Sequence, residues 1–251
     1  MKAVGIIPAR YASSRFPGKP LVEIDGKSMI QRVYEQAKKA ASLSIVIVAT
    51  DDERIESHVN GFGGEAVMTS SAHQSGTDRC AEVAGKHYHD YDVAVNIQGD
   101  EPFINPAQID HLISCFTDQD CHIATLVKKI DNPDDLSNPN KMKVVSNAFS
   151  EAIYFSRSAI PFCREQGVGK QSDWLKTHPY YKHIGIYAYR IKTLLEITKL
   201  LQSPLEITES LEQLRWIENG YKIKIKITDY ESDSVDTPED LEKLGDKFII
   251  E

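Results

Sequence analysis

The 251-residue sequence has few cysteines, no long apolar run and no excess of positive charge. Its four cysteines are scattered without a C-x-x-C pair, which argues against a zinc knuckle or a disulfide framework and suits a reducing cytoplasm. No apolar stretch approaches the roughly 18 residues that a membrane-spanning helix needs, so membrane insertion is not expected. With 37 acidic and 29 basic residues, the formal net charge is −8, and the chain should repel nucleic acid.

Two catalytic motifs and a targeting signal are missing as well. Gly26-Lys27-Ser28 resembles the end of a P-loop, but the glycine required five positions earlier is replaced by Leu21. Asp25-Gly26 instead predicts a turn between two short extended segments. There is no G-x-S-x-G sequence, so serine-hydrolase chemistry lacks support. The amino terminus is expected to enter a strand directly, without a signal-peptide pattern.

Apolar, β-branched runs alternate with amphipathic stretches through the first half of the chain. Strands that are apolar throughout and separated by amphipathic helices predict an α/β fold with a mainly parallel, Rossmann-like sheet covered on both faces. The expected strands are Ala3–Ile7, Ser44–Thr50, Glu65–Met68 and Asp92–Ile97, and the expected helices are Ser28–Ala41, Asp52–Asn60 and Gly76–Lys86.

The second half has a different pattern, which predicts a smaller antiparallel portion. Residues 129–141 are polar and turn-rich, and residues 164–180 predict an exposed excursion. Thr237 and Pro238 have the sequence of a helix start. The other expected elements are helix Asn105–Asp118, strand Ile123–Lys128, paired strands Lys143–Asn147 and Ala152–Ser156, strand Ile184–Tyr189, helices Thr193–Leu201 and Glu206–Asn219, and the alternating strand Tyr221–Thr228.

The loop after the first strand holds three cations, Arg10, Arg15 and Lys19, between small residues and two prolines. Cations in a stiff loop can neutralise phosphate oxygens, and arginine can do so with two parallel hydrogen bonds. Because the chain as a whole is acidic, these cations indicate a local site. The loop is therefore a candidate polyphosphate cradle.

Other loops that follow strands carry acids and small polar residues. Ligands of parallel α/β sheets bind outside the carboxyl ends of the strands. Asp100 follows an apolar strand and a glycine, and a carboxylate there suits magnesium beside substrate phosphates. Asp51 and Asp52 are better interpreted as helix caps or turn residues. Ser75-Gly76-Thr77 suits either a nucleobase or phosphate contact or a helix cap.

Taken together, these motifs resemble the 3-deoxy-manno-octulosonate (Kdo) cytidylyltransferase family, also called CMP-Kdo synthetases. The matching segments span nearly the whole chain in order. They are IIPARYASSRFPGKPL, VATDDE, HQSGTDR, VNIQGDEP, NPNKMKVV, YFSRSAIPF, KHIGIYAYR, SPLE with LEQLRW, and VDTPEDLE.

The resemblance implies a GT-A-like nucleotidyltransferase fold and transfer of CMP from CTP to the anomeric hydroxyl of Kdo, with Mg²⁺ as cofactor. It implies a cytoplasmic enzyme of lipopolysaccharide biosynthesis that forms a homodimer. The expected organisation is one domain, residues 1–251. Residues 1–130 would mainly bind CTP, residues 131–220 would bind sugar and dimerise, and residues 221–251 would supply a closing strand, a helix and a metal ligand.

The resemblance also implies roles for individual residues. Lys19, Arg15 and Asp100 would be catalytic, and Asp100 and Asp236 would hold the metal. The nucleotide would contact Ala9, Arg10, Ser13, Arg15, Lys19, Ser75, Gly76, Arg79 and Gln98. The sugar acid would contact Arg157, His183, Tyr187, Glu212 and Gln213, with Arg157 a candidate for its carboxylate.

The sequence departs from the family pattern at Ile207-Thr208-Glu209, where the family often has His-Ile-Glu, and residues 164–180 align poorly. Both departures lie in the sugar-binding half. An 8-amino analogue of Kdo or another sugar acid such as sialic acid therefore stays open as the substrate. A nucleotide-binding protein that keeps the GT-A-like fold without catalysis is the alternative of a different class.

Overall fold

A computed structural model of the chain describes residues 1–12, 16–167, 171–231 and 234–242. The chain divides into two compact units. One combines Met1–Ile113 with Ser232–Glu251, and the other is Ser114–Glu231. The single domain with internal boundaries near residues 130 and 220 stays a prediction.

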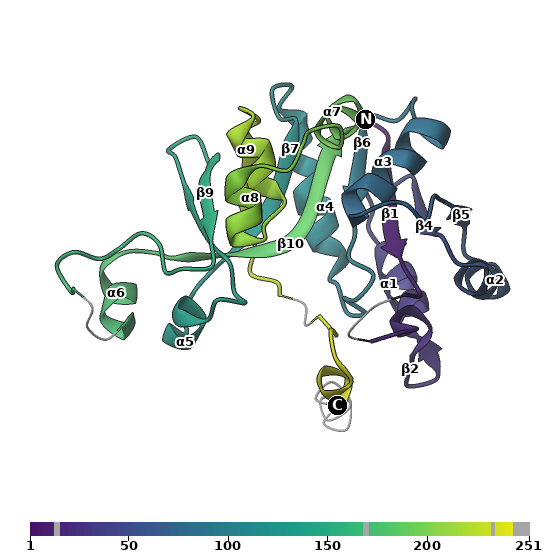
Figure 1. Ribbon diagram of the computed structural model, residues 1–251, viewed down its shortest axis with the longest axis horizontal. Coiled ribbons are helices and arrows are strands. Elements are labelled where there is room, and N and C mark those ends of the chain that lie inside the picture. Colours follow the sequence, from purple (N-terminus) through teal and green to yellow (C-terminus); the bar gives the residue numbers. More distant parts are fainter. Residues whose placement is uncertain (13–15, 168–170, 232–233, 243–251) are drawn as a thin grey trace. The chain divides into compact units, whose positions relative to one another are not determined.

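The first unit contains a parallel four-stranded sheet in the order β6-β1-β4-β5. The strands are β1 (Ala3–Ala9), β4 (Ile45–Thr50), β5 (Ala66–Met68) and β6 (Val93–Asn96). β1 pairs with β4 on one side and with β6 on the other, and β1 and β4 run side by side in Figure 1. The parallel sheet predicted from the apolar runs is confirmed.

Local capping starts the helices of this unit. The Ser28 hydroxyl accepts a hydrogen bond from the backbone N–H of Gln31 at 3.2 Å, and Asp52 accepts one from Arg54 N–H at 3.0 Å. The cap interpretation of Asp52 is therefore confirmed. The helices are α1 (Met29–Ala37), α2 (Glu53–Gly61), α3 (Gly76–His87), α4 (Pro106–Ser114), the 3₁₀ turn η1 (Lys19–Leu21) and residues 238–242.

A two-stranded hairpin, β2 (Glu23–Ile24) with β3 (Lys27–Ser28), precedes α1. Asp25 and Gly26 form its turn with φ of 47° and 73°, which is the backbone that an Asp-Gly hairpin turn requires. The turn predicted at this dipeptide is confirmed.

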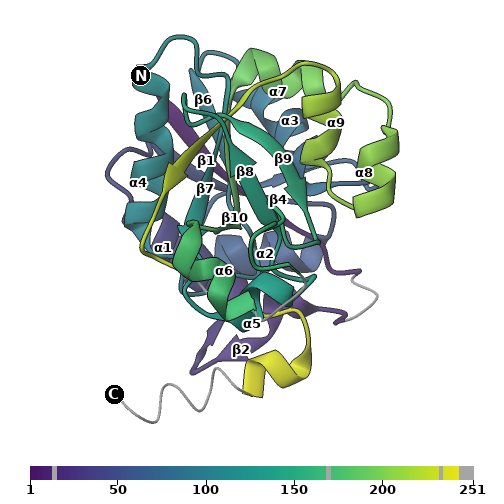
Figure 2. The same ribbon diagram turned by 90° about the vertical axis from the view of Figure 1, so that its left-hand side faces the viewer.

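The second unit has a mixed sheet. β7 (Ile123–Lys129) pairs antiparallel with β10 (Tyr181–Arg190) and parallel with β11 (Ile223–Ile227). β8 (Lys143–Ser146) pairs antiparallel with both β10 and β9 (Ala152–Ser156), as Figure 2 shows. The smaller antiparallel portion is therefore confirmed.

The single helix predicted over residues 206–219 is wrong. The segment forms α8 (Pro204–Glu209) and α9 (Gln213–Glu218), which lie side by side in both ribbon views. Ser210 ends α8 in the left-handed conformation, with φ of 53°, and this interrupts the helical path. Ile207, Leu211 and Leu214 recur at helical spacing across the break, so periodicity alone could not separate the two pieces.

The exposed excursion predicted for residues 164–180 is also partly wrong. Trp174 and Tyr180 are 4% and 1% exposed and pack with Ile130 and Leu136. These aromatic residues anchor a segment whose polar sequence shows no clear helical period. The remaining helices are η2 (Cys115–Thr117), α5 (Pro133–Ser137), α6 (Gln171–Thr177) and α7 (Ile191–Ile197). Within the described ranges, every helix is too short or too polar to cross a membrane.

Candidate active site

The loop after β1 is shaped by Gly18. Gly18 has φ of 73° and its N–H donates to the Tyr11 carbonyl at 2.9 Å. A Cβ at this position would lie 3.3 Å from the Tyr11 ring, so the turn favours glycine on two grounds. The turn places Lys19 at the first position of η1. Two residues predicted for this loop, Ser13 and Arg15, lie outside the described residues.

The side chain of Lys19 joins two carboxylates that are far apart in the sequence. Its Nζ donates to Asp100 Oδ2 at 2.8 Å and to Asp236 Oδ1 at 3.4 Å. The Lys19 side chain is 16% exposed, so solvent screens these contacts less than it would at an open surface. The structure thus brings together three of the residues predicted for catalysis and metal binding.

Close backbone packing explains why the two carboxylates meet. A Cβ on Gly99 would lie 2.9 Å from the Pro8 carbonyl oxygen, so glycine lets the loop after β6 approach β1 closely. The Val235 N–H donates to the Asp100 carbonyl at 2.9 Å, and Val235 is fully buried. Asp236 is therefore placed beside Asp100 by the backbone as well as by Lys19.

Asp100 and Asp236 fit a magnesium ion by the chemistry of their donors. Magnesium is usually bound through one or two carboxylates together with substrate phosphates and waters. Each aspartate has a carboxylate oxygen in contact with the Lys19 ammonium group. The two carboxylates are therefore close enough to bind one cation together. No group of three His, Cys, Asp or Glu side chains suited to a metal occurs among residues 1–12, 16–167, 171–231 and 234–242. The pair suits a cation that also takes ligands from a substrate.

The amino terminus of α3 lies against the end of β1. Ser75 Oγ accepts from Asp78 N–H at 3.1 Å, and the Asp78 carboxylate accepts from Ser75 N–H at 3.1 Å. Ser75 is thus the N-cap of α3, as one interpretation of the sequence expected. A Cβ on Gly76 would lie 3.1 Å from Pro8 Cγ, so a small residue lets the helix approach the strand.

The other predicted nucleotide contacts surround these strand ends. Ala9 is 4% exposed at the end of β1, and Gln98 is half-buried just after β6. Arg10 donates through Nη2 to the His73 carbonyl, in the loop that precedes α3. Ala9, Arg10, Ser75, Gly76 and Gln98 therefore lie on loops and strand ends at the carboxyl edge of the parallel sheet, where α/β folds bind ligands.

Arg79 is buried and makes contacts that hold the fold together. Its side chain is completely buried, and Nη2 donates to Asp51 Oδ2 at 3.0 Å while Nη1 donates to Thr69 Oγ1. Thr69 in turn bonds the Thr50 carbonyl at the end of β4 through its hydroxyl, at 3.0 Å. Arg79 thus ties α3 to the ends of β4 and β5. Its predicted nucleotide contact stays a prediction.

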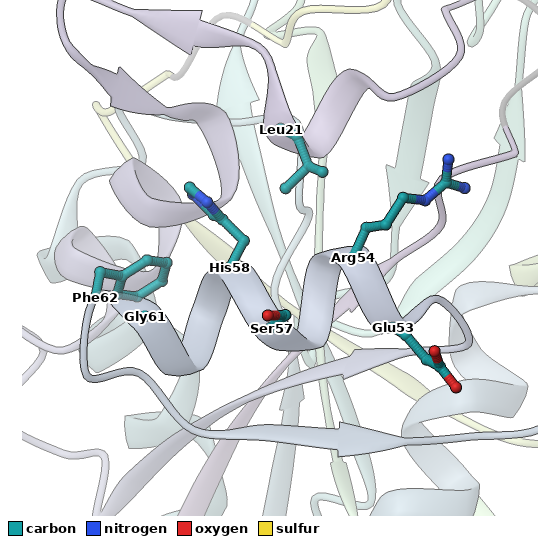
Figure 3. A pocket seen from close by; sticks show the side chains of 7 residues that line it. All are labelled: Leu21, Glu53, Arg54, Ser57, His58, Gly61 and Phe62. Carbon is teal, nitrogen blue, oxygen red and sulfur yellow. The ribbon is translucent and has the colours of Figure 1, made fainter.

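A groove of about 850 Å³ lies between Leu21 and α2. Figure 3 shows Arg54 and His58 on the side of α2 that faces Leu21, with their side chains diverging to either side of it, and Phe62 at one end of the groove. The Arg54 guanidinium lies over the Tyr11 ring, 3.3 Å from its centroid, which links this helix to the loop after β1. Among the described residues, neither Lys19 nor Asp100 lines this groove.

In the second unit, His183 and Tyr187 lie on β10 with their ring centroids 5.1 Å apart. Burial lowers the pKa of His183 to about 3, so its imidazole is neutral at physiological pH. His183 Nε2 contacts Thr125 Oγ1 at 2.9 Å, while Nδ1 is buried and has no hydrogen-bond partner among the described residues. Buried polar atoms are usually hydrogen-bonded, so Nδ1 is an exception within the described part of this unit.

Glu212 and Gln213 lie at the start of α9. Burial, and after it the Glu212 carboxylate, raises the pKa of the Tyr187 hydroxyl well above its usual value. Glu212 therefore lies close enough to Tyr187 to influence its charge. Gln213 is 6% exposed. Sugar contacts by Tyr187, Glu212 and Gln213 stay a prediction.

Arg157 is engaged with the backbone. Its Nε donates to the Glu209 carbonyl at 2.7 Å, and its two terminal nitrogens donate to the carbonyls of Pro139 and Ser210 at 3.1 and 3.3 Å. The Glu209 carboxylate accepts from Ser156 Oγ at 2.6 Å and from the Arg157 N–H at 3.0 Å. These contacts fix the turn between α8 and α9. Whether Arg157 also binds the sugar carboxylate stays a prediction.

Sequence reasoning did not assign a role to Glu209. It lies in the Ile207-Thr208-Glu209 departure, but its contacts with β9 depend on the tertiary fold. Burial acts to raise the pKa of Glu209, but hydrogen bonds from Ser156, the Arg157 N–H and Tyr154 outweigh burial and lower it. The sequence offered no clear signal for this role, because Glu209 lay inside the single helix that was predicted over residues 206–219.

Comparisons with known proteins show which family this chain is similar to. A cytidylyltransferase family model matches residues 4–225. Similar curated proteins include one from Parabacteroides distasonis, 60% identical over 97% of this chain and 96% of its own length, and one from Bacteroides thetaiotaomicron, 59% identical over 99% and 98%. Both are named 3-deoxy-manno-octulosonate cytidylyltransferase. A solved structure of CMP:2-keto-3-deoxy-manno-octonic acid synthetase complexed with CTP has a TM-score of 0.91, 43% identity, and coverage of 100% of this chain and 99% of its own.

Proposed function

Because this chain belongs to the 3-deoxy-manno-octulosonate cytidylyltransferase family, we propose that it transfers CMP from CTP to the anomeric hydroxyl of Kdo. The anomeric oxygen attacks the α-phosphorus and forms the new P–O bond. The bond from the α-phosphorus to the bridging oxygen breaks, and the products are CMP-Kdo and pyrophosphate. The hydroxyl proton leaves to solvent or a base. The observation that carries the proposal is the similarity to the named relatives over nearly the full chain.

The geometry of the first unit supports the nucleotidyl half of this reaction. Phosphoryl transfer depends mainly on positioning and on charge neutralisation. Arg10 and Lys19 follow β1 at the edge of the sheet where ligands bind, and we place the triphosphate against them. Lys19 would stand nearest the charge that develops on the leaving pyrophosphate.

We propose Asp100 and Asp236 as the ligands of Mg²⁺, which when bound would neutralise charge on the triphosphate. Replacing Asp100 with asparagine removes one anionic ligand while keeping its size. Binding of Mn²⁺ as a probe, measured by calorimetry with CTP present, should weaken about 10- to 100-fold. A Glu35→Gln variant, which alters an acid paired with Lys27 at 2.6 Å elsewhere in the same unit, should bind Mn²⁺ normally. Unchanged Mn²⁺ affinity in Asp100→Asn would remove Asp100 from the metal site.

We propose that the sugar acid is bound by five side chains, those of His183, Tyr187, Glu212, Gln213 and Arg157. The neutral imidazole of His183 can exchange one hydrogen bond with a hydroxyl through Nδ1, since Nε2 is taken by Thr125. Together with the hydroxyl of Tyr187, this gives polar contacts inside an aromatic cluster that includes Trp216.

The reaction is tested by incubating the protein with CTP, Mg²⁺ and Kdo and measuring pyrophosphate release. We expect release with Kdo, and loss of release when the metal is chelated. Parallel reactions with 8-amino Kdo and N-acetylneuraminate show which sugar acid is the preferred substrate. Faster turnover of either one would reject Kdo as the substrate. Tight CTP binding without product from any sugar acid would support a non-catalytic nucleotide-binding protein instead.

We further propose that the protein acts as a cytoplasmic homodimer. Apolar side chains are exposed on the second unit at Phe149, Ile153, Phe162 and Ile227, which are 74%, 55%, 60% and 54% exposed. Exposed apolar side chains mark a subunit interface where they form a contiguous patch. The four cysteines are scattered through the sequence without a C-x-x-C pair, which suits a reducing compartment. Sedimentation at micromolar concentration should give a dimer, and a monomer there would contradict the assembly.

A further inference from the structure

Glu82 lies in the second turn of α3 and connects the helix to the loop that precedes it. One carboxylate oxygen accepts from the Ser70 N–H at 2.9 Å and faces His73 Nε2 at 2.5 Å. The other accepts from Lys86 Nζ at 2.6 Å. The hydrogen bond from Lys86, followed by those from Ser70 and His73, lowers the pKa of Glu82 to about 2. An ionised carboxylate only accepts hydrogen bonds, so His73 must carry a proton on Nε2.

The loop that Glu82 holds runs from the end of β5 to the N-cap of α3. Ser70 Oγ accepts from the Ala72 N–H at 3.1 Å, and Gln74 Nε2 donates to the Ala72 carbonyl at 3.0 Å. The loop then ends at Ser75, which caps α3. Glu82 therefore fixes both the start of the loop, at Ser70, and its middle, at His73.

His73 also contacts the loop after β1. Its carbonyl oxygen accepts a hydrogen bond from Arg10 Nη2. The imidazole of His73 is thus held by Glu82 while its backbone orients the Arg10 guanidinium. Arg10 is the first cation after β1 and belongs to the residues proposed to bind the nucleotide. A path of two contacts therefore leads from a carboxylate on α3 to the cation that we propose to bind phosphate.

We propose that Glu82 is a positioning residue for the nucleotide: it holds His73 so that the His73 carbonyl fixes the Arg10 guanidinium for CTP. This inference rests on the proposed function, since Arg10 is assigned to CTP there. Glu82 acts through His73 and not by contact with the reacting atoms. Its effect should therefore appear in CTP binding, in the ground state and the transition state alike, and little in the chemical step.

The central experiment is steady-state kinetics of Glu82→Gln. We expect the KM for CTP to rise about tenfold, with kcat changed by less than about twofold and the KM for Kdo unchanged. A neutral amide is a weaker acceptor than a carboxylate and adds N–H groups next to the Ser70 and His73 donors. The loop therefore loses its anchor while the fold of α3 is kept.

Three further variants separate positioning from a general effect on stability. Lys86→Gln removes the third donor to the same carboxylate on a side chain that is 65% exposed, and it should leave the KM for CTP within about twofold of the parent. His73→Phe removes the ring donor but keeps the backbone carbonyl, and it should reproduce the effect of Glu82→Gln. His73→Gln, whose amide can still donate to Glu82, should restore most of the CTP affinity.

The double variant Glu82→Gln with His73→Phe should be no worse than the more affected single variant, because both remove the same contact. An unchanged KM for CTP in Glu82→Gln, or independent additive effects of the two changes, would overturn the inference. Turnover of the unaltered protein with Kdo tests the proposed function separately. If that turnover fails, calorimetric CTP affinities of the same variants decide the role of Glu82, with an unchanged affinity rejecting it.

Discussion

Replacing Lys19 with alanine should lower kcat by about 10²- to 10³-fold, while the KM for CTP rises by less than about tenfold. The ammonium group is held by Asp100 at 2.8 Å and by Asp236 at 3.4 Å, so it is positioned before the reaction begins. A positioned charge is most useful where negative charge develops, which in the proposed reaction is the leaving pyrophosphate. Its loss should therefore affect turnover more than nucleotide binding.

A matched control for this change is Lys27→Ala. Lys27 lies eight positions along the chain in the same unit, pairs with Glu35 at 2.6 Å and has a side chain that is 46% exposed. Both variants lose one positive charge and the same side-chain atoms, but only Lys19 contacts the proposed metal ligands. We expect near-normal kinetics for Lys27→Ala. Normal kcat in Lys19→Ala, with only a raised KM for CTP, would reject the catalytic assignment of Lys19.

Replacing Arg79 with methionine should lower the free energy of unfolding by about 2–4 kcal/mol. Arg79 is completely buried, and its removal leaves the carboxylate of Asp51 and the hydroxyl of Thr69 without their donor. Methionine can fill much of the same volume, so the cost comes mainly from the lost polar contacts. For a chain of this size, each 1 kcal/mol lowers Tm by about 2–4 °C, so calorimetry should show a fall of roughly 5–15 °C.

The control for Arg79 is Arg54→Met. Arg54 also pairs with an aspartate, Asp52, at 2.6 Å, but its side chain is 59% exposed. Solvent screening makes an exposed pair contribute little to stability, so the fall in Tm should be much smaller. Equal Tm values for Arg79→Met and the unaltered protein would show that the buried pair does not hold α3 to the sheet.

The sequence predicted the first unit well because its strands and helices have simple patterns. The apolar run that begins at Ala3 has the composition of a buried parallel strand, and Gly99 before Asp100 indicated a close backbone approach. Asp25-Gly26 specified a turn through its own backbone preferences. These features depend on local chemistry, which a single sequence carries.

Features that depend on tertiary packing were not predicted. The break between α8 and α9 depends on the left-handed backbone of Ser210, which a serine adopts only where its surroundings require it. The burial of Trp174 depends on Ile130 and Leu136, which come from other segments. The contact between Glu82 and His73 was not predicted either. In the sequence, Glu82 and Lys86 have the i,i+4 spacing of an ordinary ion pair on a helix surface.

The contact between Lys19 and Asp236 also has a consequence for folding. The two residues are 217 positions apart, and Ser232–Glu251 belong to the same compact unit as Met1–Ile113. A growing chain on the ribosome therefore holds Lys19 and Asp100 long before Asp236 has been made. Closing so long a loop carries an entropic cost that only the finished unit can offset. The pair of carboxylates is thus completed late in synthesis, after the second unit has been translated.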